Sequence, residues 1–358
     1  MAVILNAYYQ KLIDFGYIIM PKVDELCGGW LSARIWTFYE TNTHHFRQFD
    51  RKSRLKRKLT SCLTKYFTIN DLKFENLYIS GSTVNGFATN DSDIDLCFVV
   101  HNFFYKDFSK SKKVDILSTI ESIVSNEFEV VDSQVIEARV PILRYTDRLT
   151  GIRVEININN EIGIRNSRLL YCYSKLDWRV VPICISIKQW AKHYQIIDSF
   201  SGCLSSYCVE LMAIFYLQIC SPPLLPCLQK TDVQMFATNT DISEYRLLPD
   251  LEQLNPFKSE NQQSLGQLFV GFFKYYSLDF DFSTQVASVR LGRTISKASY
   301  VPPLDQYLWE YIAVEEPFSL DNSARTLYEL KPFLMVTNEF KKMYEKFKDL
   351  HCDCGCDY

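Results

Sequence analysis

The chain has 358 residues, 47% of them apolar and 23% charged, a balance typical of globular proteins with more than one core. This composition excludes a disordered tail protein, a collagen and a small disulfide scaffold. The 39 basic and 42 acidic side chains give a net charge of −3. The chain therefore lacks the basic excess of nonspecific nucleic-acid binders, and any grip on nucleic acid must be local or come from a partner.

We expect no secretory signal and no association with a membrane. The apolar run at residues 2–5 is short, and the longest charge-free stretch, residues 211–229, contains Pro222 and Pro223. Most of the 12 cysteines stand singly in apolar segments, which is typical of reduced core thiols. These features predict a cytoplasmic protein, with the nucleus as the alternative.

The N-terminal part of the chain is expected to be helical. Residues 1–45 carry apolar side chains at helical positions, and six of the eight residues from Arg51 to Lys58 are basic. Apolar residues then repeat at helical spacing from Leu59 to Phe67. The basic run is interpreted first as the solvated face of an amphipathic helix, with contact to an RNA backbone as the alternative.

The next part of the chain reads as strands interrupted by one helix. We expect strands at 76–80, 93–100, 128–143 and 153–157, and a helix at 113–126. Beyond residue 168 only helices are expected, at 169–176, 181–193, 205–220, 265–276 and 337–350. The sequence therefore predicts four parts: a helical segment 1–45 packing on the helical domain, a catalytic domain 46–168, a helical domain 169–350 and a tail 351–358.

Two carboxylates lie close together at the start of the second expected strand. Side chains at i and i+2 of a strand point to the same face, so Asp93 and Asp95 project together while Ile94 and Leu96 face the other way. Neighbouring carboxylates repel unless a positive charge lies between them. A divalent cation would fill that role, and oxygen-only ligands favour Mg²⁺, with Mn²⁺ as the alternative.

A glycine–serine turn precedes these carboxylates. Gly81 lets backbone N–H groups approach an anion closely, and Ser82 can donate its hydroxyl to a phosphate. A third carboxylate is expected from a neighbouring strand, and Glu155 in the run 153–157 is the candidate. It would bind one metal ion and accept the proton of an attacking hydroxyl.

The constellation resembles the DNA polymerase β-like nucleotidyltransferases, and more closely the cytoplasmic noncanonical poly(A) polymerases and terminal uridylyltransferases. Five further segments resemble family motifs in family order: 162–167 (I-G-I-R-N-S), 187–192 (I-K-Q-W-A-K), 204–207 (L-S-S-Y), 264–276 (S-L-G to Y-Y) and 315–325 (E-E-P-F to N-S-A-R). The resemblance covers roughly residues 50 to 345. It implies an α+β fold, with a mixed-sheet catalytic domain, a helical central (PAP-associated) domain and a cleft between them.

The resemblance also implies roles for side chains that would bind the nucleotide. Lys188 and Lys192 are four residues apart on one helix face and would bind the triphosphate. Ser206 would hydrogen-bond the triphosphate, and Tyr207 would stack on the base. The ribose hydroxyls would be read by the last two residues of the I-G-I-R-N-S segment, Asn166 and Ser167.

Two positions bear on which reaction the chain performs. At the position that matches Asn322, uridylyltransferases of the family often have a histidine. This chain has no histidine between residues 194 and 350. That favours ATP over UTP, although an asparagine can bind either base edge, so uridylation and mixed tails stay open. Glu155 stands where the family has aspartate, and its extra methylene leaves a catalytically weak scaffold as a further alternative.

The resulting hypothesis is template-independent addition of AMP from ATP to RNA 3′ ends by two-metal-ion nucleotidyl transfer. Asp93, Asp95 and Glu155 would hold the metal ions. The sequence contains no accessory RNA-binding module that we recognise. The resemblance therefore implies an RNA-binding protein partner that recruits and stimulates the enzyme.

Overall fold

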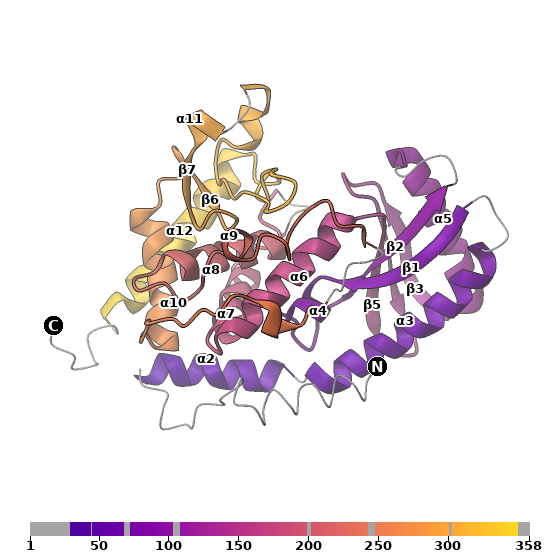
Figure 1. Cartoon of the computed structure of the whole chain (residues 1–358), viewed down its shortest axis with the longest axis horizontal. Helices are drawn as coiled ribbons and strands as arrows, with labels where there is room; N and C mark the ends of the chain where they lie inside the picture. The colour runs from indigo at the N-terminus through magenta and orange to yellow at the C-terminus, as the bar shows by residue number, and fades with distance from the viewer. Residues whose placement is uncertain are drawn as a thin grey trace. The chain divides into compact units, whose positions relative to one another are not determined.

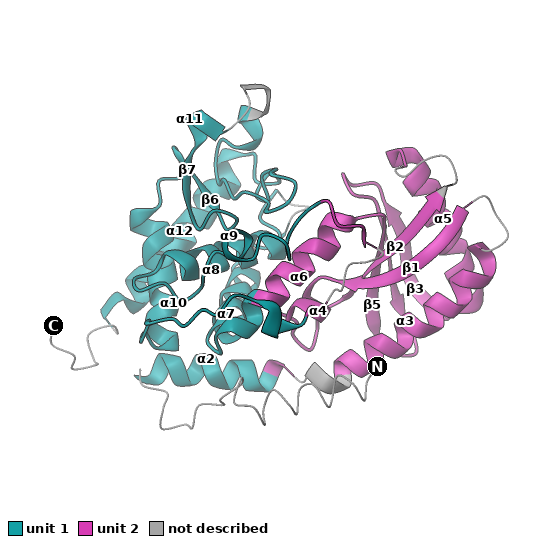
Figure 2. Cartoon of the chain, in the orientation of Figure 1, with its two compact units in different colours: residues 1–41, 173–238, 250–358 teal, residues 42–172, 239–249 magenta. Residues whose placement is uncertain are grey.

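The protein, analysed as a computed structural model, is described over residues 29–43, 45–67, 72–102, 108–198, 202–242, 248–300 and 303–349. The chain forms two compact units (Figure 2). Unit 1 takes the described residues of 1–41, 173–238 and 250–358, and unit 2 those of 42–172 and 239–249. The predicted tail 351–358 and most of the predicted segment 1–45 lie outside the described residues.

Unit 2 contains a five-stranded sheet with the order β1-β2-β5-β4-β3 (Figure 1). Strands β2 and β5 run parallel, and the other neighbouring pairs run antiparallel, so the sheet is mixed as expected. The elements of this part of the chain are α3 (His45–Phe67), β1 (Leu72–Ser80), α4 (Ser82–Asn85), β2 (Ile94–Asn102), α5 (Lys110–Glu127), β3 (Val130–Ile136), β4 (Ile142–Asp147), β5 (Ile152–Ile158) and α6 (Glu161–Leu176).

The two faces of this sheet have different coverings. Helices α3 and α5 bury their apolar sides on one face, where Ile94, Leu96 and Phe98 of β2 are fully buried. On the opposite face, Cys97 and Val99 pack with Ile164 of α6 and with Ile242 of the distant segment 239–249. Because side chains alternate along a strand, Asp95 lies on this second face. The predicted orientation of Ile94 and Leu96 away from Asp95 is therefore confirmed.

Two expectations for this region were wrong. The expected strand 128–143 is two antiparallel strands, β3 and β4, joined through residues 137–141. Pro141 directly precedes β4, and a proline has no N–H to donate to a strand ladder. The helix expected at 169–176 begins at Glu161, eight residues earlier, so the I-G-I-R-N-S segment is helical.

Unit 1 is mainly helical and has an aromatic core. Trp190 packs against Phe273 and Phe340, with ring centroids 4.6 and 5.3 Å apart. Ser32 Oγ accepts a hydrogen bond from the N–H of Gly266, which anchors the first described helix. The remaining elements are α2 (Gly29–Asn42), α7 (Val180–His193), α8 (Ser206–Ile219), α9 (Leu228–Thr231), a 3₁₀ turn (Leu251–Gln253), α10 (Leu265–Lys274), a π turn (Tyr275–Asp279), β6 (Gln285–Ser288), β7 (Arg293–Ser296), α11 (Lys297–Tyr300), a 3₁₀ turn (Pro303–Leu308) and α12 (Leu330–Phe347).

The expectation of helices alone beyond residue 168 was also wrong, because β6 and β7 form an antiparallel hairpin. Its strands are only four residues long, and the polar residues among them weaken any alternating signal. Among the described residues, no helix is long and apolar enough to cross a bilayer.

Candidate active site

Three charged side chains form a row across the second face of the sheet in unit 2. Asp95 of β2 is paired in register with Glu155 of β5, and Glu155 is paired with Arg144 of β4. Their neighbours Leu143, Tyr145, Val154 and Ile156 are all buried in the core of the other face. Strand alternation therefore directs Arg144, Glu155 and Asp95 to one side. Asp93 lies on the same side, one residue before β2 begins.

Arginines pair with two of the three predicted carboxylates. Arg144 Nε and Nη2 lie 2.8 and 2.6 Å from the same oxygen of Glu155, and both side chains are about three-quarters buried. Arg153 Nη1 lies 3.6 Å from Asp93 Oδ2. Burial raises the pKa of the Asp93 carboxyl above its usual value, while Arg153 opposes the rise and Glu155 adds to it. The site therefore concentrates negative charge that the two arginines balance.

The turn before the carboxylates is held in a conformation that favours glycine. Gly81 has a φ of 66°, and a β-carbon there would lie 2.8 Å from Cγ of Asp95. Its N–H donates to Ser167 Oγ at 2.8 Å, and that hydroxyl donates to the carbonyl oxygen of Gly163 at 2.6 Å. The backbone of this turn therefore lies against the Asp95 side chain with no room for a β-carbon, and Ser82 follows as the first residue of α4.

A buried lysine is hydrogen-bonded next to the same turn. Lys52 of α3 is only 3% exposed. Its ammonium donates to Thr83 Oγ1 and to the carbonyl oxygen of Asp93, both at 3.1 Å. Lys52 therefore ties α4 to the residue that begins the carboxylate pair, and its positive charge favours the ionised form of Asp93.

The two predicted ribose-binding residues of α6 differ in their surroundings. Asn166 is buried, and its Oδ1 has no hydrogen-bond partner among the described residues. A buried polar atom without a partner is rare, and it is what a site for a ligand hydroxyl would present. Ser167 is 2% exposed, and its hydroxyl joins Gly81 to Gly163. In this conformation Ser167 positions the turn and does not offer its hydroxyl to a ribose.

The predicted triphosphate lysines of α7 also differ. Lys188 is buried and forms an ion pair of 2.9 Å with Glu210 of α8, whereas Lys192 is exposed. A buried lysine is stabilised in its charged form by such a carboxylate partner. Lys192 is the cation of this pair that solvent and solutes can reach.

Ser206 and Tyr207 begin α8 in unit 1. The preceding Ser205 caps this helix by accepting from the N–H of Cys208 at 3.1 Å. Ser206 is half-buried at the helix N-terminus, a position whose free N–H groups favour anions. The hydroxyl of Tyr207 donates to Glu316 Oε1 at 3.0 Å, which fixes the orientation of its ring.

The structure contradicts the predicted base-reading role of Asn322. Its Oδ1 accepts from the N–H groups of Val314 and Ala324, at 3.0 and 2.9 Å. Its Nδ2 donates to the carbonyl oxygens of Leu308 and Ile312, at 2.7 and 2.9 Å. An asparagine amide has two donor hydrogens and two acceptor lone pairs, so all of its capacity is used by the backbone. Asn322 is a structural residue that is 2% exposed.

The donors at the carboxylate row fit a hard divalent cation in chemical type. Asp93, Asp95 and Glu155 supply only oxygen, and they lie on one face of neighbouring strands. Within the described ranges, however, no three His, Cys, Asp or Glu side chains are gathered into a ready metal site. Arg144 and Arg153 engage two of the carboxylates, so a cation would have to compete with them.

Sequence reasoning did not identify Lys52, Arg144 and Arg153. Lys52 is one of six basic residues in a short run, and nothing in the sequence marks it as the buried one. Arg144 could have been found by aligning the strands that flank Glu155, since the two residues are in register. Arg153 lies two residues before Glu155, and strand alternation places it on the same face.

Comparison with known proteins agrees with this arrangement. Residues 31–175 match the model of the central palm domain of mitochondrial-like poly(A) RNA polymerases, and residues 264–322 match that of the Cid1 family of poly(A) polymerases. Poly(A) RNA polymerase GLD2-A of Xenopus laevis is 37% identical over 276 residues, which cover 76% of this chain and 52% of that protein. The chain belongs to the noncanonical poly(A) polymerase and terminal uridylyltransferase family.

Solved structures of this family share the fold. The structure of a GLD-2/RNP-8 complex superposes with a TM-score of 0.71 and 29% identity, covering 91% of this chain and 98% of that one. The Cid1 poly(U) polymerase with magnesium and 3′-dATP bound gives a TM-score of 0.70 and 26% identity, covering 88% and 94%. The expected two-domain nucleotidyltransferase fold is therefore confirmed. The curated relatives are longer, since the chain spans 24% of the Drosophila melanogaster gld-2 homolog A and 64% of GLD2 of Rattus norvegicus.

Proposed function

We propose that this protein adds nucleotides to RNA 3′ ends without a template, and that it transfers AMP from ATP. The observation that carries the proposal is the register of Asp95 and Glu155 on parallel strands, with Asp93 on the same face and the Gly81 turn against Asp95. Carboxylate oxygens that can hold divalent cations, beside a turn that can approach phosphates, fit nucleotidyl transfer. Membership of the family supports the same reaction.

Asp93, Asp95 and Glu155 would hold the divalent cations, Mg²⁺ or alternatively Mn²⁺, which when bound polarise the attacking hydroxyl and neutralise the triphosphate. Glu155 accepts the proton of the RNA 3′-hydroxyl as that oxygen attacks the α-phosphorus, while the bond from the α-phosphorus to the β-phosphate oxygen breaks and pyrophosphate leaves. Ser82 is proposed to direct its N–H and O–H groups toward the phosphates, while Gly81, whose N–H is donated to Ser167, shapes the turn. Asn166 receives a ribose hydroxyl through its unpartnered Oδ1.

In unit 1, Lys192 and Ser206 are proposed to bind phosphate oxygens, and the ring of Tyr207 to stack on the base. Lys188 would act through its pair with Glu210, because its ammonium is buried and already has a carboxylate partner. Ser167 is proposed to hold the Gly81 turn.

The preference for ATP is supported by the relatives, which are named poly(A) RNA polymerases. It no longer has support from Asn322, whose amide is used by the backbone. Uridylation and mixed tails are the less favoured alternatives.

We also propose that an RNA-binding protein partner recruits this chain to its RNA. The net charge of −3 supports this, as does the solved GLD-2/RNP-8 complex, which contains a relative of this chain with a second protein. A cytoplasmic location is proposed as well. No disulfide joins the described cysteines, which is what a reducing compartment would give.

The test is extension of a labelled RNA oligonucleotide with each of the four nucleoside triphosphates in turn, with Mg²⁺ and with Mn²⁺. A ladder with ATP alone supports the proposal, and a ladder with UTP alone would replace adenylation by uridylation. The Asp95→Asn variant, made in parallel, should give no ladder. A ladder from that variant would remove the carboxylate row from the mechanism.

A second candidate function is a catalytically weak scaffold. The specific observation in its favour is that Glu155 replaces the family's aspartate and is held by Arg144. If the wild-type chain gives no ladder and Glu155→Asp gives one, the scaffold is the better description. If wild type extends RNA and Glu155→Asp is slower, Glu155 is the working carboxylate of this chain.

A further inference from the structure

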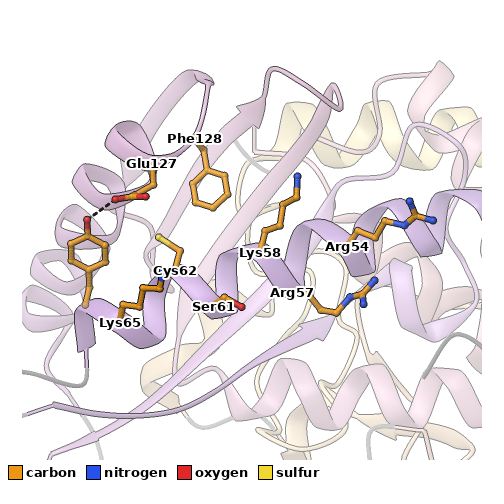
Figure 3. Close-up of a pocket in the computed structure, with 9 residues that line it drawn as sticks. Arg54, Arg57, Lys58, Ser61, Cys62, Lys65, Glu127 and Phe128 are labelled. Atoms are coloured by element: carbon orange, nitrogen blue, oxygen red, sulfur yellow. Dashed lines mark hydrogen bonds between the residues drawn. The ribbon is translucent and has the colours of Figure 1, made fainter.

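Unit 2 carries a basic groove on the outer side of α3, away from the carboxylate row. The groove has a volume of about 790 Å³ and lies between α3 and the junction of α5 with β3 (Figure 3). We call it the α3 groove. Its lining residues are Arg54, Arg57, Lys58, Ser61, Cys62, Lys65, Tyr66, Glu127 and Phe128.

The cations of the α3 groove are arranged in two rows along the helix. Arg54 and Lys58 are four residues apart and are followed by Cys62, while Arg57 and Lys65 are separated by two turns with Ser61 between them. Residues four apart lie on the same helix face, so the rows run side by side. At 1.5 Å per residue they extend over about 16 Å. This length suits a linear polyanion better than a single phosphate.

Most of this positive charge is available to a ligand. Arg57, Lys58 and Lys65 are exposed, and none of them forms an ion pair with another described residue. Arg54 is paired with Asp50 at 2.6 Å, but it is 67% exposed. Lys52, on the opposite side of the helix, is buried and donates a hydrogen bond to the carbonyl oxygen of Asp93, so it is not part of the groove.

The α3 groove has one carboxylate in its lining, Glu127, which opposes binding of an anion. It accepts a hydrogen bond of 2.7 Å from the hydroxyl of Tyr66, so part of its charge is already engaged. The lining of the groove therefore contains four cationic side chains and one carboxylate, and that carboxylate already accepts a hydrogen bond. The balance favours an anionic ligand.

Two aromatic rings add a second kind of contact. Tyr66 is 42% exposed, and Phe128 is half-buried across the groove from Cys62 (Figure 3). Aromatic faces beside a row of cations are typical of sites for single strands, because unpaired bases stack on the rings while phosphates meet the cations. A duplex would keep its bases stacked inside and leave the rings unused.

We propose that the α3 groove binds the single-stranded RNA upstream of its 3′ end, through phosphate contacts to Arg57, Lys58 and Lys65 and base stacking on Phe128. The proposal rests on the proposed function, because it takes RNA to be the substrate. Lys52 and Lys65 lie on one helix and are about 20 Å apart along its axis. An RNA with its 3′ end at Asp93 must therefore be several nucleotides long to reach the far end of the groove.

The first measurement is the affinity of the full chain for a fluorescent single-stranded oligonucleotide, by anisotropy and without nucleoside triphosphate. The triple variant Arg57→Gln, Lys58→Gln, Lys65→Gln should bind about tenfold or more weakly. Its plot of log affinity against log salt should be shallower by about two, since each lost phosphate contact removes about 0.7 from the slope. Since no nucleotide is present, the result does not depend on whether the chain is an active polymerase.

The matched control is the triple variant Lys341→Gln, Lys342→Gln, Lys346→Gln on exposed positions of α12, which removes the same charge from unit 1. It should bind RNA as the wild type does. Equal losses in both triple variants would reduce the effect to net charge and overturn the proposal. So would unchanged binding in the α3 variant.

The second measurement reads the groove directly through Cys62. RNA should protect Cys62 from alkylation, measured by peptide mass spectrometry, while Cys227, a half-buried thiol of unit 1, should react at an unchanged rate. Protection of Cys62 by an acidic peptide and not by RNA would assign the groove to a protein partner instead. Loss of extension on a long primer but not on a dinucleotide primer in the α3 variant would link the groove to the reaction.

Discussion

Arg144 and Glu155 face each other across the antiparallel pair β4–β5, and two guanidinium nitrogens of Arg144 contact the same oxygen of Glu155. This pairing directs a carboxylate that is one methylene longer than the family's aspartate. The opposite face of the sheet at this position is a closed apolar core. Neither Arg144 nor Glu155 can therefore turn its charged side chain toward that face. The position of the Glu155 carboxylate therefore depends on Arg144 of the neighbouring strand β4 as well as on its own strand β5.

Breaking the Arg144–Glu155 pair should lower the free energy of unfolding. Arg144→Met leaves a three-quarters buried carboxylate without its partner, and we expect it to cost about 1–3 kcal/mol. Glu155→Gln, measured alone and with Arg144→Met, completes a double-mutant cycle by urea denaturation. A coupling energy of about 0.5–3 kcal/mol is expected, and additive effects would mean that the pair contributes nothing.

Asp93→Asn should make the protein more stable at neutral pH while lowering nucleotide transfer by about a thousandfold or more. The pKa of Asp93 is raised in the folded protein, so protonated Asp93 favours folding at low pH, and that contribution is lost as the pH rises through the folded pKa. The neutral amide avoids this loss. The gain in melting temperature should be largest at pH 7 and shrink toward pH 4, and a gain that grows on acidification would reverse the assignment.

Gly81→Ala should be compared with Gly151→Ala. Both glycines have positive φ, 66° and 68°, but a β-carbon at Gly151 meets nothing within 4 Å whereas one at Gly81 meets Asp95. Gly151→Ala should cost about 1–2 kcal/mol for its positive φ. Gly81 has a ψ of −155°, in a region that is essentially restricted to glycine, so its backbone cost should be about 1–3 kcal/mol. Gly81→Ala should cost more and should lower transfer by about a hundredfold through displacement of Asp95. Equal stability and activity in the two variants would show that the Gly81 contact is unimportant.

Two buried asparagines should respond in opposite ways. Asn322→Ala leaves the buried N–H groups of Val314 and Ala324 without an acceptor, so we expect a loss of about 2–4 kcal/mol and an unchanged preference between ATP and UTP. Asn166→Ala removes a carbonyl that has no partner in the described part of the chain, so it should cost under about 1 kcal/mol but raise the KM for nucleotide. A shift in base preference without loss of stability in Asn322→Ala would restore its base-reading role.

The carboxylate row could be predicted because strand alternation is a local rule. Asp93 and Asp95 are two residues apart, and Glu155 stands in a strand of the same kind. The pairing of Glu155 with Arg144 depends on which strands are neighbours, and the break at Pro141 was missed. The role of Asn322 was mistaken for a related reason, because its four backbone partners lie in irregular segments and at the end of a short 3₁₀ turn, whose conformations have no periodic signal.

The basic run that begins at Arg51 also shows what the sequence alone does not predict. Composition identifies the basic residues of this run, but their different roles depend on which of them are buried. Lys52 is hydrogen-bonded to Thr83 and Asp93 beside the Gly81 turn, while Arg57 and Lys58 line the α3 groove. Only the packing of α3 on the sheet separates these residues.

The discontinuity of unit 2 has a consequence for the order in which the newborn chain can fold. Arg165 donates to the carbonyl oxygen of Thr240 at 2.6 Å, and Ile242 covers Cys97 and Val99 on the sheet. During translation, the sheet of unit 2 is complete by residue 158, but this cover is made only after residues 173–238 of the other unit. At about 5–20 residues per second the ribosome needs several seconds to supply it. Throughout that interval Cys97 and Val99 can be covered by Ile164 of α6 but lack the part of their cover that Ile242 provides.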